Sequence, residues 1–362
     1  MRRLLIDSGG SSDDVLALLM AARSSEVEIV AVTAIAGCVR VGQAAENLLY
    51  GLEVAGASRV PVYLGCERPL LRPHTPFEPL HGRSGMGAHN HPRAKQRPES
   101  AHAVDAILSL CRHYRKELDI VCLGPPTNLA AALIQSPKLA EMPGRVYVYG
   151  GSSDGGNVTA SAEFNFHTDP EAASLVLDSG LPITLVGWDQ ARQHMTMREG
   201  DIHRIRQGTT RECRLFMEST RTFAEYCRRT LRMRGSALGA VLTMAVALDP
   251  GVVRESVRVR ADVETRGEIT RGQVVFDAVG LSHRPANVQR VCDADGERAR
   301  EMLFSALGAP PVTVGRPQQV PEMGESESPP QPPAEAETPD RTPQGSAEPV
   351  PVPDAPSDTT RD

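Results

Sequence analysis

The sequence predicts an α/β protein with a mostly parallel, Rossmann-like open sheet flanked by helices. Short apolar runs are repeatedly followed by a glycine-containing loop and then by a segment with helical spacing, which is typical of parallel strands joined by helical crossovers. Aromatic residues make up only 4% of the chain, while Ala, Val and Leu are abundant. This composition suits a parallel sheet buried under helices, and 362 residues suffice for a large core.

The N-terminal half contains the clearest strand–loop–helix units. The first is an apolar strand at 4–6, a loop of small residues, and a helix that begins at Asp13 with an apolar face. Further strands are expected at 26–34, 59–64, 118–123, 146–149 and 183–186, and further helices at 42–55, 101–115 and 129–135. The stretch 69–98 is rich in Pro, Gly and His and predicts a long loop, which in a compact domain is usually functional or mobile.

The C-terminal half has a different pattern. The charged stretch 199–234 is expected to be helical, and 237–248 is apolar all round, which predicts a buried helix. Val alternates with polar residues in 257–276, which indicates a small antiparallel addition, and 288–307 combines a strand with a final helix. We therefore expect one domain over residues 1–314.

Residues 315–362 are predicted to form a disordered, acidic tail rich in Pro, Glu and Ser, because they lack the apolar content to fold. From Arg316 onward the tail has ten acidic residues and three arginines, so it accounts for the formal net charge of −6 and leaves the domain almost neutral. A neutral domain gives no electrostatic reason to expect nucleic acid or an anionic membrane as a partner. The sequence leaves the partner of the tail open.

Seven cysteines are scattered without a CxxC or zinc-finger spacing, which favours free thiols in a reducing compartment. No apolar run is long enough for a signal peptide or a membrane span. We therefore expect a cytoplasmic protein that does not associate with membranes.

Carboxylates gather at the first turn of the chain. Asp7 follows the first strand, and Asp13 and Asp14 open the helix after a Gly/Ser loop. Ligands of open α/β sheets bind at this edge, so a site is expected here. Acidic residues in the first turn of a helix also have a structural explanation, because they stabilise the positive end of the helix dipole.

A second polar block, with Asn157, Glu163 and Asn165, places amides and a carboxylate close together. Such groups suit a ligand with several hydroxyls, although ordinary turns also use Asn and Gly. Trp188 is left open between stacking on a ligand and packing in the core. His89 and His91 are better explained as solvated loop residues than as metal ligands, and Cys38 as a buried thiol.

Taken together, several blocks in order over about residues 3–307 resemble the inosine-uridine preferring nucleoside hydrolase family. The matching segments are the opening loop at 7–14, HGRSGMG at 81–87, GPPTN at 124–128, YGG at 149–151, GNVTASAEFNFHTDPEAA at 156–173, LDP at 248–250 and TRGQVVFD at 270–277.

The resemblance implies hydrolysis of the N-glycosidic bond of ribonucleosides to ribose and free base. It implies a Ca²⁺ ion held by carboxylates and a backbone carbonyl, an aspartate that activates water, and an oxocarbenium-like transition state. It also implies a homo-oligomer with a small nucleoside or ribose as its partner. Carried over by position, the substrate-binding residues are Asp13, Asn157, Glu163, Asn165, Tyr149 and His81, and the metal-binding residues are Asp14, Thr127 and Asp7.

Several catalytic positions depart from the family pattern. Gly9 stands where the family has the aspartate that serves as both metal ligand and base, and Cys38 replaces an asparagine. Gly239 and Ala240 stand where the family has its leaving-group histidine and another metal-binding aspartate. We therefore expect hydrolysis to be weak or lost. The alternatives are a catalytically inactive nucleoside- or ribose-binding or structural pseudoenzyme, and a working hydrolase with a rearranged site.

Overall fold

The computed structural model describes residues 1–87 and 91–311, so the predicted tail and His89 lie outside the described residues. The strands are β1 (Arg2–Ser8), β2 (Val27–Ala34), β3 (Val62–Leu64), β4 (Leu118–Cys122), β5 (Val146–Tyr149), β6 (Ile183–Val186), β7 (Val253–Val263), β8 (Val274–Asp277) and β9 (Val288–Ala294). The helices are α1 (Ser12–Arg23), α2 (Val41–Val54), α3 (Glu78–His81), α4 (Ala103–Tyr114), α5 (Thr127–Gln135), α6 (Phe164–Thr168), α7 (Pro170–Asp178), α8 (Trp188–His194), α9 (Glu199–Gln207), α10 (Arg211–Ser219), α11 (Arg221–Arg229), α12 (Gly239–Leu248) and α13 (Gly296–Leu307).

The strands form one nine-stranded sheet in the order β3-β2-β1-β4-β5-β6-β9-β7-β8. The pairs from β3 to β9 along this order are parallel, whereas β7 pairs antiparallel with both β9 and β8. The predicted α/β class, with a mostly parallel sheet and a small antiparallel addition, is confirmed. The strand order reverses between β1 and β4, where doubly wound sheets open a crevice for ligands.

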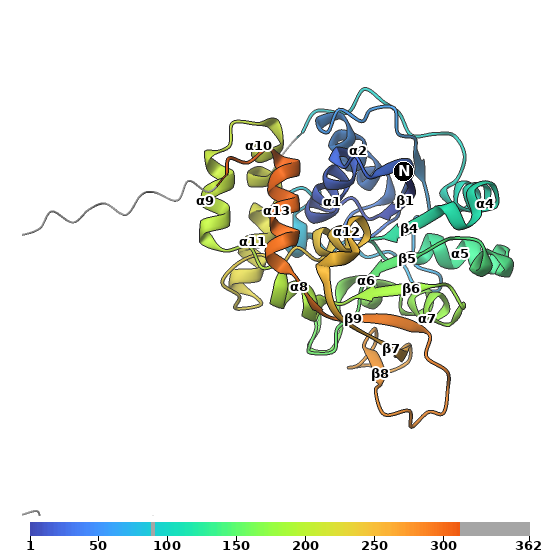
Figure 1. Cartoon of the computed structure of the whole chain (residues 1–362). Helices are drawn as coiled ribbons and strands as arrows, with labels where there is room; N and C mark the ends of the chain where they lie inside the picture. Colours follow the sequence, from blue (N-terminus) through green and yellow to red (C-terminus); the bar gives the residue numbers. More distant parts are fainter. Residues whose placement is uncertain (88–90, 312–362) are drawn as a thin grey trace, which may run out of the picture. The chain divides into compact units, whose positions relative to one another are not determined.

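Helices cover both faces of the sheet (Figure 1). Successive residues of β1 point to opposite faces, so Leu4 and Ile6 join one core cluster and Leu5 joins the other. The first cluster lies under α1, α2, α12 and α13, and the second lies under α4, α5 and α7. The central strands β4 and β5 are buried along their whole length, and their side chains are mostly apolar.

Helix α12 is the buried helix predicted from its all-round apolar sequence, and each of its ten residues is buried. Among the described residues, no helix is long and apolar enough to cross a membrane. All seven cysteines are free, as expected.

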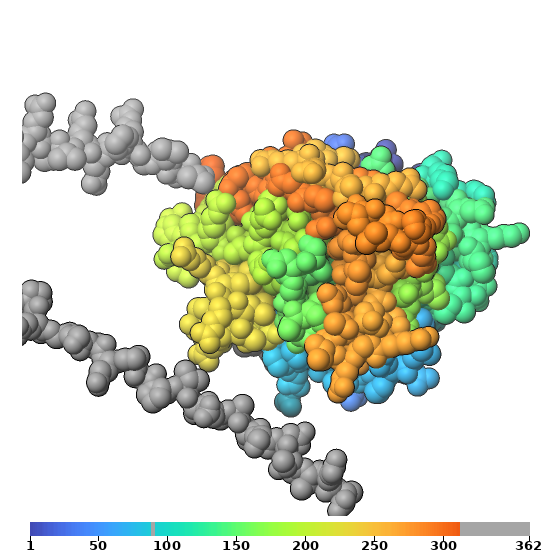
Figure 2. All heavy atoms as spheres, turned by 90° about the horizontal axis from the view of Figure 1, so that it is seen from below, coloured from blue at the N-terminus to red at the C-terminus, as the bar shows by residue number. Residues whose placement is uncertain are grey.

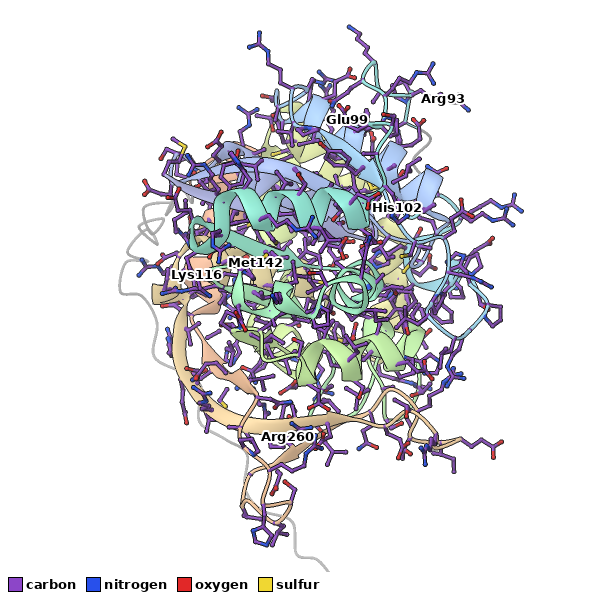
Figure 3. All side chains as sticks on the ribbon, turned by 90° about the vertical axis from the view of Figure 1, so that its right-hand side faces the viewer. Arg93, Glu99, His102, Lys116, Met142 and Arg260 are labelled. Atoms are coloured by element: carbon purple, nitrogen blue, oxygen red, sulfur yellow. The ribbon has the colours of Figure 1, made fainter. Side chains whose placement is uncertain are left out.

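Two polar contacts lie on the side of the sheet that α4, α5 and α7 cover, and Figure 3 labels His102 and Arg260, which take part in them. His102 caps α4 by accepting a hydrogen bond from the backbone N–H of Val104 at 3.2 Å. Arg260 of β7 pairs with Asp178, the last residue of α7, at 2.5 Å. The second contact ties the antiparallel addition to the parallel part of the domain.

Some boundaries differ from the prediction. The helical stretch 199–234 is divided into α9, α10 and α11, because the chain turns at Gly208 and again at Thr220. The stretch 69–98 is largely irregular, as expected, but contains the short helix α3. Trp188 is 1% exposed and belongs to the first core cluster, so the core alternative holds for this residue.

Truncating a core side chain should destabilise the domain strongly. Leu16 of α1 is fully buried in the first cluster, so Leu16→Ala removes apolar contacts and leaves a cavity. We expect the free energy of unfolding to fall by about 2–5 kcal/mol, measured by urea denaturation. The control Val257→Ala removes a side chain that is 44% exposed and should change stability by less than about 1 kcal/mol. Equal losses in both variants would contradict this assignment of the core.

Candidate functional site

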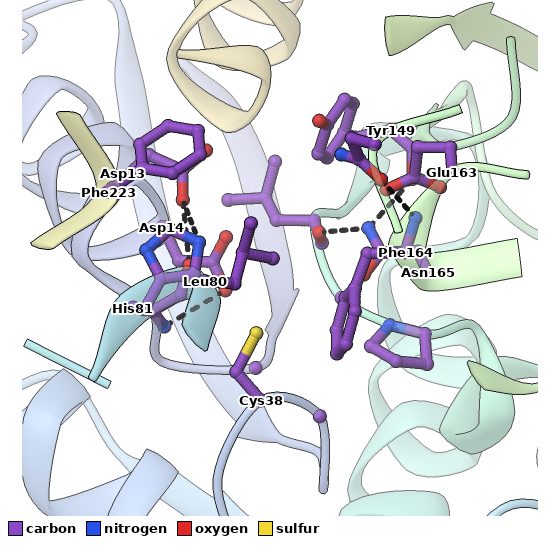
Figure 4. Close-up of a pocket in the computed structure, with 17 residues that line it drawn as sticks. Asp13, Asp14, Cys38, Leu80, His81, Tyr149, Glu163, Phe164, Asn165 and Phe223 are labelled. Atoms are coloured by element: carbon purple, nitrogen blue, oxygen red, sulfur yellow. Dashed lines mark hydrogen bonds and ion pairs between the residues drawn. The ribbon is translucent and has the colours of Figure 1, made fainter. Parts of the chain in front are cut away.

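A pocket lies at the point where the strand order reverses (Figure 4). It encloses a cavity of about 30 Å³, which is room for a water molecule rather than a nucleoside. Its walls come from the loops after β1, β2, β4 and β5 and from α3, α6 and α11. The lining residues are Gly9, Ser11, Asp13, Asp14, Gly37, Cys38, Leu80, His81, Leu123, Gly124, Pro125, Tyr149, Asn157, Glu163, Phe164, Asn165 and Phe223.

The loop between β1 and α1 brings Asp13 and Asp14 to one wall. Its sharp turn needs Gly10, which has φ +64° and lies so close to α2 that a Cβ would be 2.5 Å from the Ala44 carbonyl oxygen. Asp14 Oδ2 accepts hydrogen bonds from Ser8 Oγ at 3.0 Å and from the Ser11 backbone N–H at 3.3 Å. The cap position therefore explains part of the role of Asp14, while its carboxylate still faces the pocket.

His81 enters the same wall from α3. Its Nδ1 is 2.8 Å from Ser12 Oγ, and its Nε2 is 3.6 Å from Asp13 Oδ1. Phe223 of α11 packs on the imidazole with ring centroids 4.6 Å apart. Burial lowers the pKa of His81, although Asp13 partly opposes this shift, so the neutral imidazole is favoured.

The opposite wall contains the block 157–165. Asn157 Oδ1 accepts the backbone N–H of Phe164 at 2.8 Å, and Asn165 Nδ2 donates to the carbonyls of Leu123 at 2.7 Å and Tyr149 at 3.1 Å. Glu163 Oε2 accepts the backbone N–H groups of Gly151 and Phe166. Each of the two asparagine amides therefore uses one of its two polar atoms in hydrogen bonds. Within the described chain, no hydrogen bond uses the other atom, which is Nδ2 of Asn157 or Oδ1 of Asn165.

Burial without a countercharge dominates the electrostatics of the pocket. It raises the pKa of Glu163 to about 7 and that of Asp14 to about 8, and the neighbouring Asp13 contributes to the second shift. Within residues 1–87 and 91–311, no lysine or arginine lies within ion-pair distance of Asp13, Asp14 or Glu163. The protonated forms of Asp14 and Glu163 are therefore stabilised near neutral pH.

The positions that depart from the family pattern differ in the space around them. A Cβ on Gly9 would lie 3.5 Å from Asp14 Oδ2, which is an ordinary contact. A Cβ on Gly239 would lie 2.2 Å from the Tyr149 ring, so Tyr149 occupies the space that a side chain at position 239 would need. The backbone N–H of Ala240 donates to Asp13 Oδ2 at 3.3 Å.

The structure brings six of the predicted substrate-binding residues to this pocket: Asp13, His81, Tyr149, Asn157, Glu163 and Asn165. Of the predicted metal-binding residues, only Asp14 lines it. Asp7 is turned into the protein, where Oδ1 accepts hydrogen bonds from Thr33 Oγ1 at 2.6 Å and Asn128 Nδ2 at 2.8 Å. The Thr127 hydroxyl donates to Asp169 at 2.7 Å.

Leu80, Phe164 and Phe223 form an apolar part of the pocket that was not predicted from the sequence. Phe164 lies between Glu163 and Asn165, which were predicted to bind substrate, so its position in the sequence could have indicated a place in the site. Phe223 belongs to a charged helix with no motif, and only the packing of α11 against α3 brings it to the site.

The residues present do not fit the Ca²⁺ ion that the family resemblance implies. Ca²⁺ takes six to eight oxygen ligands, most often with several carboxylates among them. Positions 9 and 240 offer no side-chain oxygen, and Asp7 is committed to buried hydrogen bonds. The described part of the chain has no group of three or more His, Cys, Asp or Glu residues placed to hold a metal ion.

Known proteins share both the sequence and the fold. The family profile described as inosine-uridine preferring nucleoside hydrolase matches residues 4–301. The inosine-uridine preferring nucleoside hydrolase of Crithidia fasciculata is 29% identical over 308 residues, covering 84% of this chain and 97% of that protein. The pyrimidine-specific ribonucleoside hydrolase RihA of Photobacterium profundum is 31% identical over 307 residues, covering 84% and 98%.

Among solved structures, the plant nucleoside hydrolase PpNRh1 superposes with a TM-score of 0.81 at 28% identity, covering 85% of this chain and 99% of that one. The match therefore extends over almost the whole length of the relatives and includes every strand of the sheet. The chain belongs to the inosine-uridine preferring nucleoside hydrolase family.

Proposed function

We propose that this family member has weak or no ordinary metal-dependent nucleoside hydrolysis and that its pocket binds a ribonucleoside or ribose without efficient cleavage. One observation carries the proposal. Gly9, Gly239 and Ala240 stand at the positions of the base, the leaving-group histidine and a metal-binding aspartate, and the space beside Gly239 is filled by Tyr149.

The loss of charge at these positions affects both metal binding and water activation. Two missing carboxylates take two negative charges away from a divalent cation site, and affinity depends on that charge. Loss of a general base alone typically lowers a rate by about 10²–10⁴-fold. His81 is no evident replacement for the acid that assists the leaving group, because burial favours its neutral form.

The retained groups support binding of a hydroxylated ligand. Asp13, Asn157, Glu163 and Asn165 all face the same pocket. The Asn157 amide offers a donor and the Asn165 amide offers an acceptor, and ribose hydroxyls need both. Since the cavity holds only about 30 Å³, entry of a nucleoside requires Leu80, His81 or Phe223 to move.

A working hydrolase with a rearranged site is the second candidate. It is supported by the four residues just named and by Asp14, all of which line the pocket. This candidate requires one of the carboxylates to act as base, and the two proposals differ in whether ribose is released.

The purified full chain should release ribose from inosine, uridine and cytidine at least about 10²-fold more slowly than the Crithidia fasciculata hydrolase assayed in parallel. Gly9→Asp, alone and combined with Ala240→Asp, returns carboxylates to the pocket and should raise release in the presence of added Ca²⁺. The measurement is a reducing-sugar assay with and without a chelator.

Gly200→Asp is the matched control, because it adds the same carboxylate at a position with no atom within 4 Å of the new Cβ, in α9 and outside the pocket. It should leave the rate unchanged. Turnover by the unmodified chain comparable to that of the Crithidia fasciculata enzyme, abolished by the chelator, would overturn the proposal and favour the second candidate.

Stability should fall as pH rises from about 4 to 8. Burial raises the pKa values of Asp7 to about 6, Glu163 to about 7 and Asp14 to about 8, so between their ordinary and raised values the folded state binds more protons than the unfolded state. Raising the pH through this window therefore lowers the free energy of unfolding, by about 1.4 kcal/mol per unit of pKa difference for each group. Urea denaturation at a series of pH values measures the slope.

Asp14→Asn keeps the size of the side chain and removes the charge, so it should flatten the upper part of this pH profile. Asp154→Asn is the control, because that side chain is 77% exposed. A profile that rises with pH, or one that both variants change equally, would show that the buried carboxylates do not carry the effect.

A further inference from the structure

A second and larger cavity, of about 310 Å³, lies beside the first pocket. It is enclosed by the segment that follows β3, by α6, and by the turn that precedes β8. Figure 2 shows the orange surface of the β7–β8 region next to the blue surface of the segment that follows β3, on one face of the domain. Arg72 Nη2 joins the two segments by donating to the Thr265 carbonyl at 3.1 Å. We call this space the arginine cavity, because Arg72 and Arg271 line it.

The two arginines are held differently. Arg72 forms a two-pronged ion pair with Glu171, with Nη2 2.7 Å from Oε1 and Nε 3.3 Å from Oε2. Arg271 donates through Nη2 to Nε2 of His167 at 2.8 Å, and no carboxylate of the described residues lies within ion-pair distance of it. The Glu171 carboxylate therefore balances one of the two guanidinium groups, and the arginine cavity keeps a net positive charge.

His167 is the group that orients Arg271. Its Nε2 accepts from the guanidinium, and its Nδ1 is 3.3 Å from the backbone carbonyl of Arg271, so this ring nitrogen carries the proton and donates. Burial and the two neighbouring arginines lower the pKa of His167, which keeps the ring neutral. A neutral ring can accept a hydrogen bond without offsetting the positive charge of the arginine cavity.

Much of the remaining wall is apolar, although Thr75 and Thr168 also line it. Pro69, Pro73, Phe77 and Phe164 line it, and the two phenylalanine rings lie with centroids 6.2 Å apart. A volume of about 310 Å³ falls at the lower end of the range of small-molecule sites. Apolar faces around a guanidinium suit a ring that carries an anionic group, because the ring packs on the wall while the anion pairs with the fork of Arg271.

We propose that the arginine cavity binds a small ring compound bearing a phosphate or a carboxylate, with Arg271 as the anion contact and His167 as its positioning residue. The inference does not depend on whether the first pocket hydrolyses nucleosides. Phe164 lines both spaces, and the charged groups of the two are of opposite sign: carboxylates in the first and arginines in the second.

Calorimetric titration of the full chain at low and high salt tests this assignment. The probes are uridine 5′-monophosphate, orotate and inorganic phosphate, with neutral uracil for comparison, because uracil lacks the ribose that the first pocket is proposed to bind. We expect at least one ring anion to bind about tenfold or more tightly than uracil, and more weakly at high salt. Preference for the nucleotide identifies a phosphate ligand, and preference for orotate identifies a carboxylate.

Arg271→Gln should weaken binding of the preferred anion by about tenfold or more, because a charge-assisted hydrogen bond is lost from a half-buried site. Arg271→Lys keeps the charge but not the fork and should give an intermediate affinity. Arg266→Gln, the same substitution in the same hairpin at an exposed arginine, should have no effect. Circular dichroism and thermal unfolding of each variant establish that it is folded.

The proposal is overturned if folded wild-type protein binds neither ring anion more tightly than uracil. It is equally overturned if folded Arg271→Gln and Arg266→Gln bind the preferred anion alike.

Discussion

The buried amide of Asn128 holds together the strand ends on which the site is built. Its Nδ2 donates to Asp7 Oδ1 at 2.8 Å and to the Ala34 carbonyl at 3.1 Å, and its Oδ1 accepts the Cys66 backbone N–H at 2.8 Å. One side chain at the start of α5 thus connects the ends of β1, β2 and β3. Buried polar groups are costly when unpaired, so this network fixes the strand ends in one arrangement.

This network also defines the role of Asp7. Its carboxylate satisfies Asn128 and Thr33 inside the protein instead of facing the pocket. Of the acidic residues in the opening turn, only Asp13 and Asp14 reach the cavity. No described lysine or arginine pairs with either of them, and burial favours the protonated form of Asp14. The turn therefore has well-satisfied hydrogen bonds, but it presents only two carboxylates to the cavity, which is few for a divalent cation.

The chain has the family fold, whereas the loss of activity that we propose depends on a few positions in the pocket. A fold does not by itself determine function, because activity depends on a few side chains placed on it. A Cβ at position 9 would make only an ordinary contact, whereas a Cβ at position 239 would overlap the Tyr149 ring. Next to this pocket, the arginine cavity combines residues from three separate segments and carries the opposite charge.

Sequence patterns alone predict the parallel α/β class, the first strand–loop–helix unit, the buried helix α12 and the polar residues at the strand ends. These features follow from local periodicity, from glycine turns and from the rule that parallel strands end at one edge.

Other features are visible only in the three-dimensional packing. They are the breaks between α9, α10 and α11, the inward orientation of Asp7, and the contact of Phe223 with His81. The overlap of Tyr149 with the space beside Gly239 and the shared cavity of Arg271 and Arg72 are further examples. These contacts join residues that are distant in the sequence, and no local pattern encodes which distant side chains share a space.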